Sequence, residues 1–135
     1  LSIKRRDHWE SREQAFELLR PKALYKSFDE ECFQDYIDHA LTDDPVKGGV
    51  SLTISKYDEV DIFRTNTTMM WLPMAKPTVK MHLVVGKESP FLKQKFPQKI
   101  LKKFGIPFTT TPGGHMFPLE HPVEVVNLIR DLIKR

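Results

Sequence analysis

The feature that most constrains this sequence is an apolar, β-branched segment followed at once by a sharp turn, a histidine and a helix start. Residues 106–111 are rich in Thr, Ile and Phe, which predicts a short strand. Residues 112–114 read Pro-Gly-Gly and predict a turn with positive φ. His115 follows directly, ahead of a helix that starts near Pro122. A histidine on a tight loop after a strand is held rigidly while its ring can face a cleft, as a general base requires. The alternative is a loop histidine that only packs or caps the helix.

A second strand is predicted over residues 79–85, the best strand pattern in the chain. Its nearly continuous apolar character indicates a strand covered on both faces, as in a parallel α/β sheet. Residues 97–104 predict a helix that Gly105 closes, and the residues from Pro122 onward predict an amphipathic helix. Because strands and helices alternate, the second half predicts parallel strands with right-handed crossovers and an α/β fold class.

The first half of the chain is predicted to be mostly helical. Helices or helical turns are expected over residues 11–20, 29–41, 56–64 and 67–74. Capping-box patterns begin at Ser11, with Gln14, and at Ser27, with Glu30. A turn-rich connector over 42–49 and a short strand over 50–54 complete this half. We therefore expect a helical cap over residues 1–76 and the strands and helices of an α/β core over residues 77–135.

Length and composition exclude several classes of protein. The chain has 135 residues, of which 40% are hydrophobic and 29% charged, and this is globular rather than disordered composition. A net charge of +3 does not by itself argue for a nucleic-acid partner. The single cysteine, Cys32, cannot form an intrachain disulfide, and the sequence shows no signal-peptide pattern or membrane-spanning run. We therefore expect an intracellular, cytoplasmic protein.

The string that begins at the glycine turn, G-G-H-M-F-P-L-E-x-P-x-x-V-V-x-x-I, resembles the region around the catalytic histidine of α/β-hydrolases. In that family this histidine follows the last strand of the sheet and precedes the last helix. Residues 4–15, in which basic residues and a tryptophan precede Ser-Arg-Glu-x-Ala, look like a segment of the family's cap, and residues 48–52 and 63–65 fit its far end. The resemblance implies the cap and the C-terminal portion of an α/β-hydrolase, of the serine esterase or lipase type.

The resemblance also implies that part of the catalytic machinery lies elsewhere. In the family mechanism a serine attacks an acyl carbonyl, His115 would take its proton, and a carboxylate orients the imidazole. The G-x-S-x-G elbow is absent from this sequence, and family order places it earlier. Two strands are also too few for a stable parallel sheet. We therefore expect the N-terminal half of the same hydrolase as a partner, either as a separate chain or as a further segment.

Two sources of the catalytic acid stay open. Many family members carry an aspartate in the loop after the strand that matches residues 79–85, but that position reads Ser89 or Pro90 here. Glu88 is the nearby carboxylate and one candidate for the acid; the alternative, which carries more weight, is that Glu88 is a solvated surface charge. Some relatives place the acid after an earlier strand, outside this chain, and that interpretation is favoured here.

The other histidines and the lysines predict little chemistry. His8 and His121 are interpreted as surface or capping residues, His39 as structural and His82 as packed inside a strand. No spacing of His, Cys or carboxylates fits a zinc site, and no cofactor is expected. The lysines of the second half are interpreted as solvated faces of a helix and loops, with attraction to anionic membrane lipids as the lesser alternative. No nucleic-acid partner is expected.

Apolar residues of the first half suggest a substrate class. They either line an acyl pocket or form core, and they are Trp9, Phe28, Phe63, Met69, Met70 and Trp71. In the first case the substrate is a hydrophobic or lipid-like ester. Two rival hypotheses stay open: a non-catalytic α/β-hydrolase-like binding protein, and a hydrolase that uses an aspartate nucleophile on epoxides or haloalkanes. The residue at the elbow separates these hypotheses.

Overall fold

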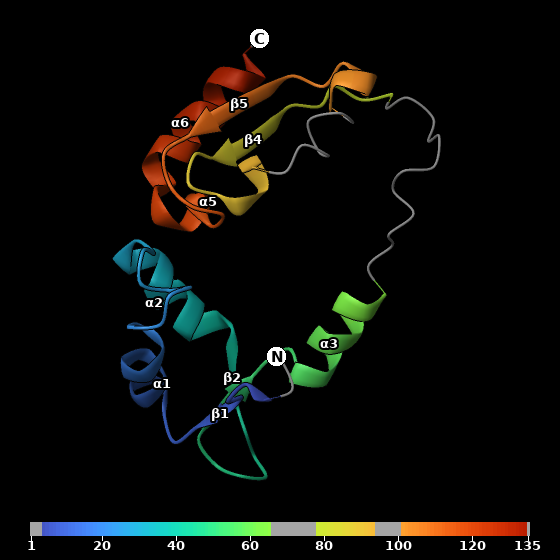
Figure 1. Cartoon of the computed structure of the whole chain (residues 1–135). Helices are drawn as coiled ribbons and strands as arrows, with labels where there is room; N and C mark the ends of the chain where they lie inside the picture. The colour runs from blue at the N-terminus through green and yellow to red at the C-terminus, as the bar shows by residue number, and fades with distance from the viewer. Residues whose placement is uncertain (1–3, 66–77, 94–100, 135) are drawn as a thin grey trace. The chain divides into compact units, whose positions relative to one another are not determined.

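The computed structural model describes residues 4–65, 78–93 and 101–134 (Figure 1). The chain divides into two compact units, Leu1–Leu72 and Pro73–Arg135. None of the helices in the described ranges combines the length and apolar character needed to cross a membrane. The predicted helical turn over residues 67–74 lies outside the described residues.

The described residues of the first unit, 4–65, form three helices and a small antiparallel sheet. Its elements are β1 (His8–Trp9), α1 (Arg12–Leu19), α2 (Glu30–His39), β2 (Leu41–Asp43), β3 (Val50–Leu52) and α3 (Lys56–Arg64). Strand β3 lies between β1 and β2 and pairs antiparallel with both. The predictions of α1, α3 and the strand at Val50 are confirmed. The predicted helix over residues 29–41 is confirmed as α2 but ends at His39, and residues 41–43, at the start of the predicted connector, form β2 and pair with β3.

The core of this unit is an aromatic and aliphatic cluster between α1, α2 and the sheet. Phe33 of α2 is fully buried and its ring lies 4.8 Å from that of Phe16. Trp9 and Phe28 are 1% and 4% exposed, so the structure makes them core residues rather than pocket-lining ones. The Tyr25 and Tyr36 hydroxyls lie 2.9 Å apart, and burial, followed by that hydrogen bond, raises the pKa of Tyr25.

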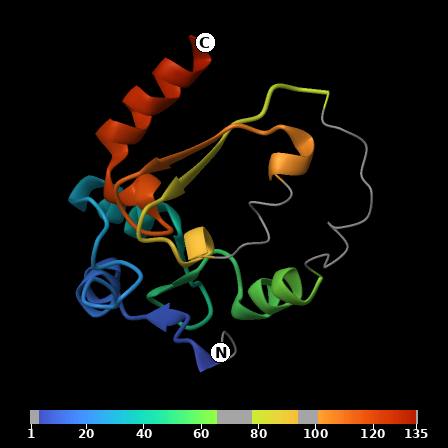
Figure 2. The same cartoon turned by 45° about the horizontal axis from the view of Figure 1, so that its top comes forward.

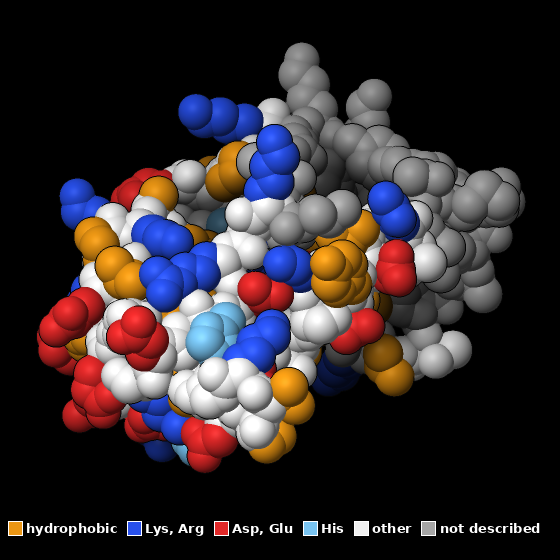
Figure 3. Space-filling model, turned by 90° about the horizontal axis from the view of Figure 1, so that it is seen from below, with side chains coloured by type: hydrophobic (Ala, Val, Ile, Leu, Met, Phe, Trp, Pro, Cys, Tyr) orange, Lys and Arg blue, Asp and Glu red, His pale blue; other side chains and the backbone are white. Residues whose placement is uncertain are grey.

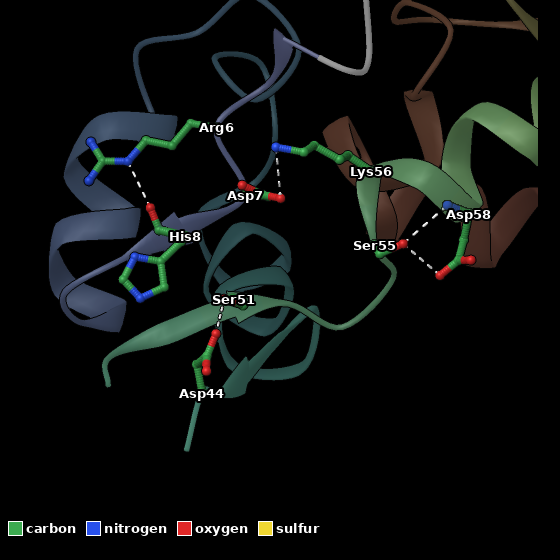
Figure 4. A network of polar contacts seen from close by, with 8 residues as sticks. All are labelled: Arg6, Asp7, His8, Asp44, Ser51, Ser55, Lys56 and Asp58. Carbon is green, nitrogen blue, oxygen red and sulfur yellow. Dashed lines mark hydrogen bonds and ion pairs between the residues drawn. The ribbon is translucent and has the colours of Figure 1, made fainter. Parts of the chain in front are cut away.

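Polar contacts join the elements of the first unit at its surface (Figure 4). The Ser51 hydroxyl donates to Asp44 Oδ2 at 2.8 Å, which holds the turn before β3 against the strand. Lys56, at the start of α3, pairs with Asp7, just before β1, at 3.2 Å. On the face shown in Figure 3, Lys and Arg side chains lie among Asp and Glu side chains. Such partly exposed pairs contribute less than about 1 kcal/mol each.

The second unit contains a two-stranded parallel sheet and the terminal helices (Figures 1 and 2). Its elements with described bounds are β4 (Leu83–Gly86), η2 (Pro90–Lys93), β5 (Phe108–Thr111), α5 (Phe117–Glu120) and α6 (Pro122–Ile133), and residues 101–104 are also helical. Strands β4 and β5 pair in register from Leu83 opposite Phe108 to Gly86 opposite Thr111. The predicted parallel pairing, the strand at 108–111 and the helix from Pro122 are confirmed.

Strand β4 is shorter than the predicted strand over residues 79–85. The ladder begins at Leu83, whose amide donates to the carbonyl of Pro107. Pro107 has no amide of its own to extend the ladder, and Gly105, with φ of +65°, turns the chain just before it. His82 consequently lies ahead of the strand, exposed, with Nε2 2.7 Å from Thr109 Oγ1, and the prediction that it packs inside a strand is wrong.

The second unit buries few of its apolar side chains. Among the described residues of the two units, Val125 is the one buried hydrophobic residue of the second unit, whereas the first unit buries nine. On α6, Val126, Ile129 and Ile133 are exposed. Because unburied apolar faces on strands and helices normally pack against another layer, the second unit has apolar surface that remains to be covered.

The start of α2 differs from its predicted capping and yields a stability prediction. Asp29, not Ser27, is the N-cap: its Oδ1 accepts from the amides of Glu31 and Cys32. Ser27 is exposed and lies too early in the chain to reach these amides. We expect Asp29→Ala to lower the free energy of unfolding by about 1 kcal/mol, and Ser27→Ala to change it by only a few tenths. Urea denaturation followed by circular dichroism measures both; equal effects of the two substitutions would contradict this assignment.

Candidate functional site

His115 lies on the loop that leaves the carboxyl end of β5. The loop starts after Thr111, turns at Gly113, whose φ is +98°, and ends in the short helix α5. This confirms the predicted order of strand, glycine turn, histidine and helix. In open α/β sheets, ligands bind at the carboxyl ends of the strands, so the position suits a functional side chain.

The loop after β4 and the histidine loop are held together by their backbones. The amide of Lys87 donates to the carbonyl of Thr111 at 2.8 Å, and the amide of Glu88 donates to the carbonyl of Gly113 at 3.0 Å. A Cβ atom on Gly86 would collide with the carbonyl oxygens of Gly113 and Gly114. The absence of a side chain at position 86 therefore permits this approach.

A carboxylate from the helix after His115 holds the glycine turn that precedes it. The amide of Gly114, the residue before His115, donates to Glu120 Oε2 at 2.6 Å. Glu120 is the last residue of α5, and His121 follows as the N-cap of α6 without a side-chain cap hydrogen bond. A Cβ on Gly113 would lie 2.8 Å from Glu120 Oε2 and from His121 Cδ2, so the turn packs tightly on α5.

The imidazole of His115 borders an apolar cavity of about 310 Å³ within the second unit. The residue is exposed, and its ring centroid lies 4.7 Å from that of Phe91 in η2, at a tilt of 46°. The other lining residues are Leu83, Val84, Val85, Gly86, Ser89, Leu92, Leu101, Phe108 and Phe117. The arrangement can hold an apolar group beside an imidazole that solvent and substrate can reach.

The loop after β4 carries a buried serine at one of the two positions where the resemblance to α/β-hydrolases leads us to expect an aspartate. Ser89 is 1% exposed, and its hydroxyl accepts from the amide of Phe91 at 3.3 Å. Glu88 is exposed. Among the described residues, no carboxylate is hydrogen-bonded to the imidazole of His115. The acid that would orient this ring is therefore not identified in the described ranges.

The remaining titratable residues do not gather around His115. His8 Nε2 lies 2.7 Å from the carbonyl of Gly48 in the first unit, and His39 is exposed at the end of α2. Burial, with nearby carboxylates, raises the pKa of the Cys32 thiol, which is the opposite of an activated nucleophile. Across residues 4–65, 78–93 and 101–134, no three His, Cys, Asp or Glu residues come together as a metal site would require.

Sequence reasoning placed His115 on the loop after the strand but did not predict the contacts that hold this loop. Gly86 and Phe91 were not singled out, and Glu120 entered only as part of the string around the histidine, because their importance comes from contacts between residues of this region. The position of Glu120, five residues after the histidine and two before a helix-starting proline, is the available signal.

No protein-family model matches this sequence, and no curated protein does. Two solved structures are similar to it. The crystal structure of E-2-(acetamidomethylene)succinate hydrolase has a TM-score of 0.74 and 16% identity, with 95% of this chain and 47% of that chain covered. A thioesterase domain from the curacin biosynthetic pathway has a TM-score of 0.66 and 22% identity, with 96% of this chain and 46% of that chain covered. The chain thus spans about half the length of these α/β-hydrolases.

At this identity the likeness concerns the fold. It agrees with the parallel pair β4 and β5 and the terminal helix α6. The chain therefore has an α/β-hydrolase fold in part, comprising last strands and helices of the core together with a largely helical cap.

Proposed function

We propose that this chain supplies the general base and part of the acyl pocket of a serine hydrolase that acts on a hydrophobic or lipid-like carboxylic ester. The observation that carries the proposal is the imidazole of His115 at the border of an apolar cavity, at the carboxyl ends of two parallel strands. The hydrolases with a similar fold support the broader class, namely a hydrolase.

The proposed reaction uses His115 twice. His115 removes the proton of a serine hydroxyl while the serine oxygen attacks the acyl carbonyl, and it then gives that proton to the departing alkoxide. An acyl-serine and an alcohol result. Water, deprotonated by His115, then attacks the acyl-serine and releases the carboxylic acid, and the serine regains its proton. Backbone amides would stabilise the oxyanion in both steps.

The serine is proposed to come from the N-terminal half of the same hydrolase, as a further segment or as a partner chain. Two observations support this source. The chain spans about half the length of the similar solved structures. The second unit also leaves apolar side chains exposed, with Val126 at 45%, Ile129 at 48% and Ile133 at 79%. The missing half would cover such surface by packing against it.

His115→Ala is expected to abolish turnover in the full-length protein. Loss of a triad histidine lowers kcat by about a million-fold in a comparable hydrolase, so the residual rate should be near background. The measurement is hydrolysis of p-nitrophenyl esters, together with labelling by a fluorophosphonate probe that reacts with an activated serine. His39→Asn, at an exposed histidine of α2, is the control and should retain both signals. Wild-type turnover in His115→Ala would refute the general-base role.

The apolar cavity leads to a prediction about acyl chain length. Each CH₂ group that enters apolar surroundings contributes about 0.8 kcal/mol, so kcat/KM should rise roughly fourfold per CH₂ until the cavity is full. A p-nitrophenyl ester series from acetate upward measures this. Leu101→Phe, which narrows the cavity, should shorten the preferred chain, while Val46→Ala, at a fully exposed cap residue, should not. Equal kcat/KM along the whole series would argue against an apolar acyl pocket.

The acid is proposed to lie after an earlier strand, outside this chain, rather than at Glu88. The exposure of Glu88 and the lack of a described hydrogen bond to His115 support this choice. Glu88→Gln is therefore expected to keep kcat within about twofold of wild type, because solvated surface charges contribute little. Steady-state ester hydrolysis by the full-length protein measures it. A fall of about 10⁴-fold, as seen when a triad aspartate is replaced by asparagine, would instead assign the acid to Glu88.

A non-catalytic binding protein is the second candidate function. The lack of a carboxylate bonded to His115 among the described residues favours it, because an imidazole without an orienting acid is a poor general base. The same fluorophosphonate experiment separates the candidates. Labelling of the wild-type protein that depends on His115 supports the serine hydrolase. Absence of labelling together with ester binding supports the binding protein, and turnover without labelling points to an aspartate nucleophile.

A further inference from the structure

We propose that Glu120 is a positioning residue for His115: its carboxylate holds the amide of Gly114 and thereby sets the place of the histidine backbone. The expected effect of this contact on turnover rests on the proposed function, whereas its effect on the conformation of the histidine loop does not.

The contact between Glu120 and the loop is short and charge-assisted. Gly114 N lies 2.6 Å from Glu120 Oε2, below the usual range for an amide bonded to a neutral oxygen. Glu120 forms no ion pair with a lysine, arginine or histidine in the described part of the chain. Its negative charge therefore acts on the loop amide rather than on a neighbouring cation.

The hydrogen bonds of helix α5 fix the backbone position of Glu120. The amides of Leu119 and Glu120 donate to the carbonyl of Met116 at 2.8 and 3.2 Å, and the amide of His121 donates to that of Phe117 at 2.9 Å. These bonds set the backbone at the end of α5. The carboxylate then bridges back to Gly114 and closes a short ring of chain that contains His115.

The peptide group between Gly113 and Gly114, just before His115, is held at both of its polar atoms. The amide of Glu88 donates to its carbonyl oxygen, and its N–H donates to Glu120 Oε2. The ring of Phe91 lies against the imidazole. Without the carboxylate, this peptide group keeps the bond from the Glu88 amide alone, and glycine backbone has wide conformational freedom. A displacement of about 1 Å at a general base can lower the rate about 100-fold.

The contact differs from that of a catalytic acid. A triad carboxylate bonds to the ring nitrogen of the histidine, whereas Glu120 Oε2 bonds to the backbone amide of the preceding residue. A neutral amide oxygen can accept the same bond. Glu120→Gln should therefore restore most of what Glu120→Ala loses, which would not hold for a charged triad acid.

The test compares Glu120→Ala and Glu120→Gln in the full-length protein, with Glu124→Ala as the matched control. Glu124 is an exposed glutamate in the first turn of α6. In ester hydrolysis, Glu120→Ala is expected to lower kcat by about 10- to 100-fold, with KM within about threefold. Glu120→Gln should recover kcat to within about fivefold of wild type, since a neutral acceptor retains roughly half of a charge-assisted bond. Glu124→Ala should match wild type.

A second measurement does not depend on activity. The Gly114 amide proton should resonate downfield and exchange slowly in wild-type protein, move upfield and exchange faster in Glu120→Ala, and stay close to wild type in Glu120→Gln. An unchanged Gly114 resonance in Glu120→Ala would overturn the proposal. A shifted resonance with unchanged kcat would also overturn it, because the contact would then be structural only. If His115→Ala retains turnover while the Gly114 resonance responds as expected, the proposed function fails and the loop contact stands.

Discussion

The structure around His115 depends on one close approach of two backbones. Strands β4 and β5 end level, with Gly86 opposite Thr111, so the loops that leave them run side by side. Only the missing Cβ at Gly86 leaves room for the carbonyl oxygens of Gly113 and Gly114. Once the loops are this close, the amides of residues 87 and 88 reach their acceptors. These main-chain bonds place the loop that carries the histidine, and the Glu120 carboxylate adds its bond with the Gly114 amide.

The two units differ in how far they bury their apolar side chains. The first unit closes a core of its own around Trp9 and Phe33. The second unit has a two-stranded sheet, and its terminal helix keeps apolar residues exposed on one side. A two-stranded sheet with one helical layer is marginal alone, because strands of this kind need neighbours at their edges and layers on both faces. The proposed N-terminal half would supply these neighbours and would cover the exposed apolar residues of α6.

Local signals in the sequence predicted much of the fold and non-local contacts decided the rest. Helix α1 follows from the serine cap at Ser11 and apolar periodicity, and the turn before His115 follows from Pro-Gly-Gly chemistry. Strands β1 and β2 were missed because each is short and exists only through pairing with β3. The same division applies to the site. His115 could be named from its place in the chain, whereas Glu120 and Phe91 matter through contacts that only the folded loops create.

Among the described residues, the loop after β4 contributes packing, and no carboxylate, to the surroundings of His115, and Ser89 shows how. Ser89 is buried, and its hydroxyl accepts from the amide of Phe91, which begins the turn of η2 and brings an aromatic ring beside the imidazole. A carboxylate in that buried place would need a compensating cation or several donors, and the serine needs neither. The Phe91 ring packs against the imidazole at a tilt of 46° and carries no charge. This loop therefore shapes and packs the histidine side of the cavity, and under the proposed function the orienting charge comes from another part of the fold.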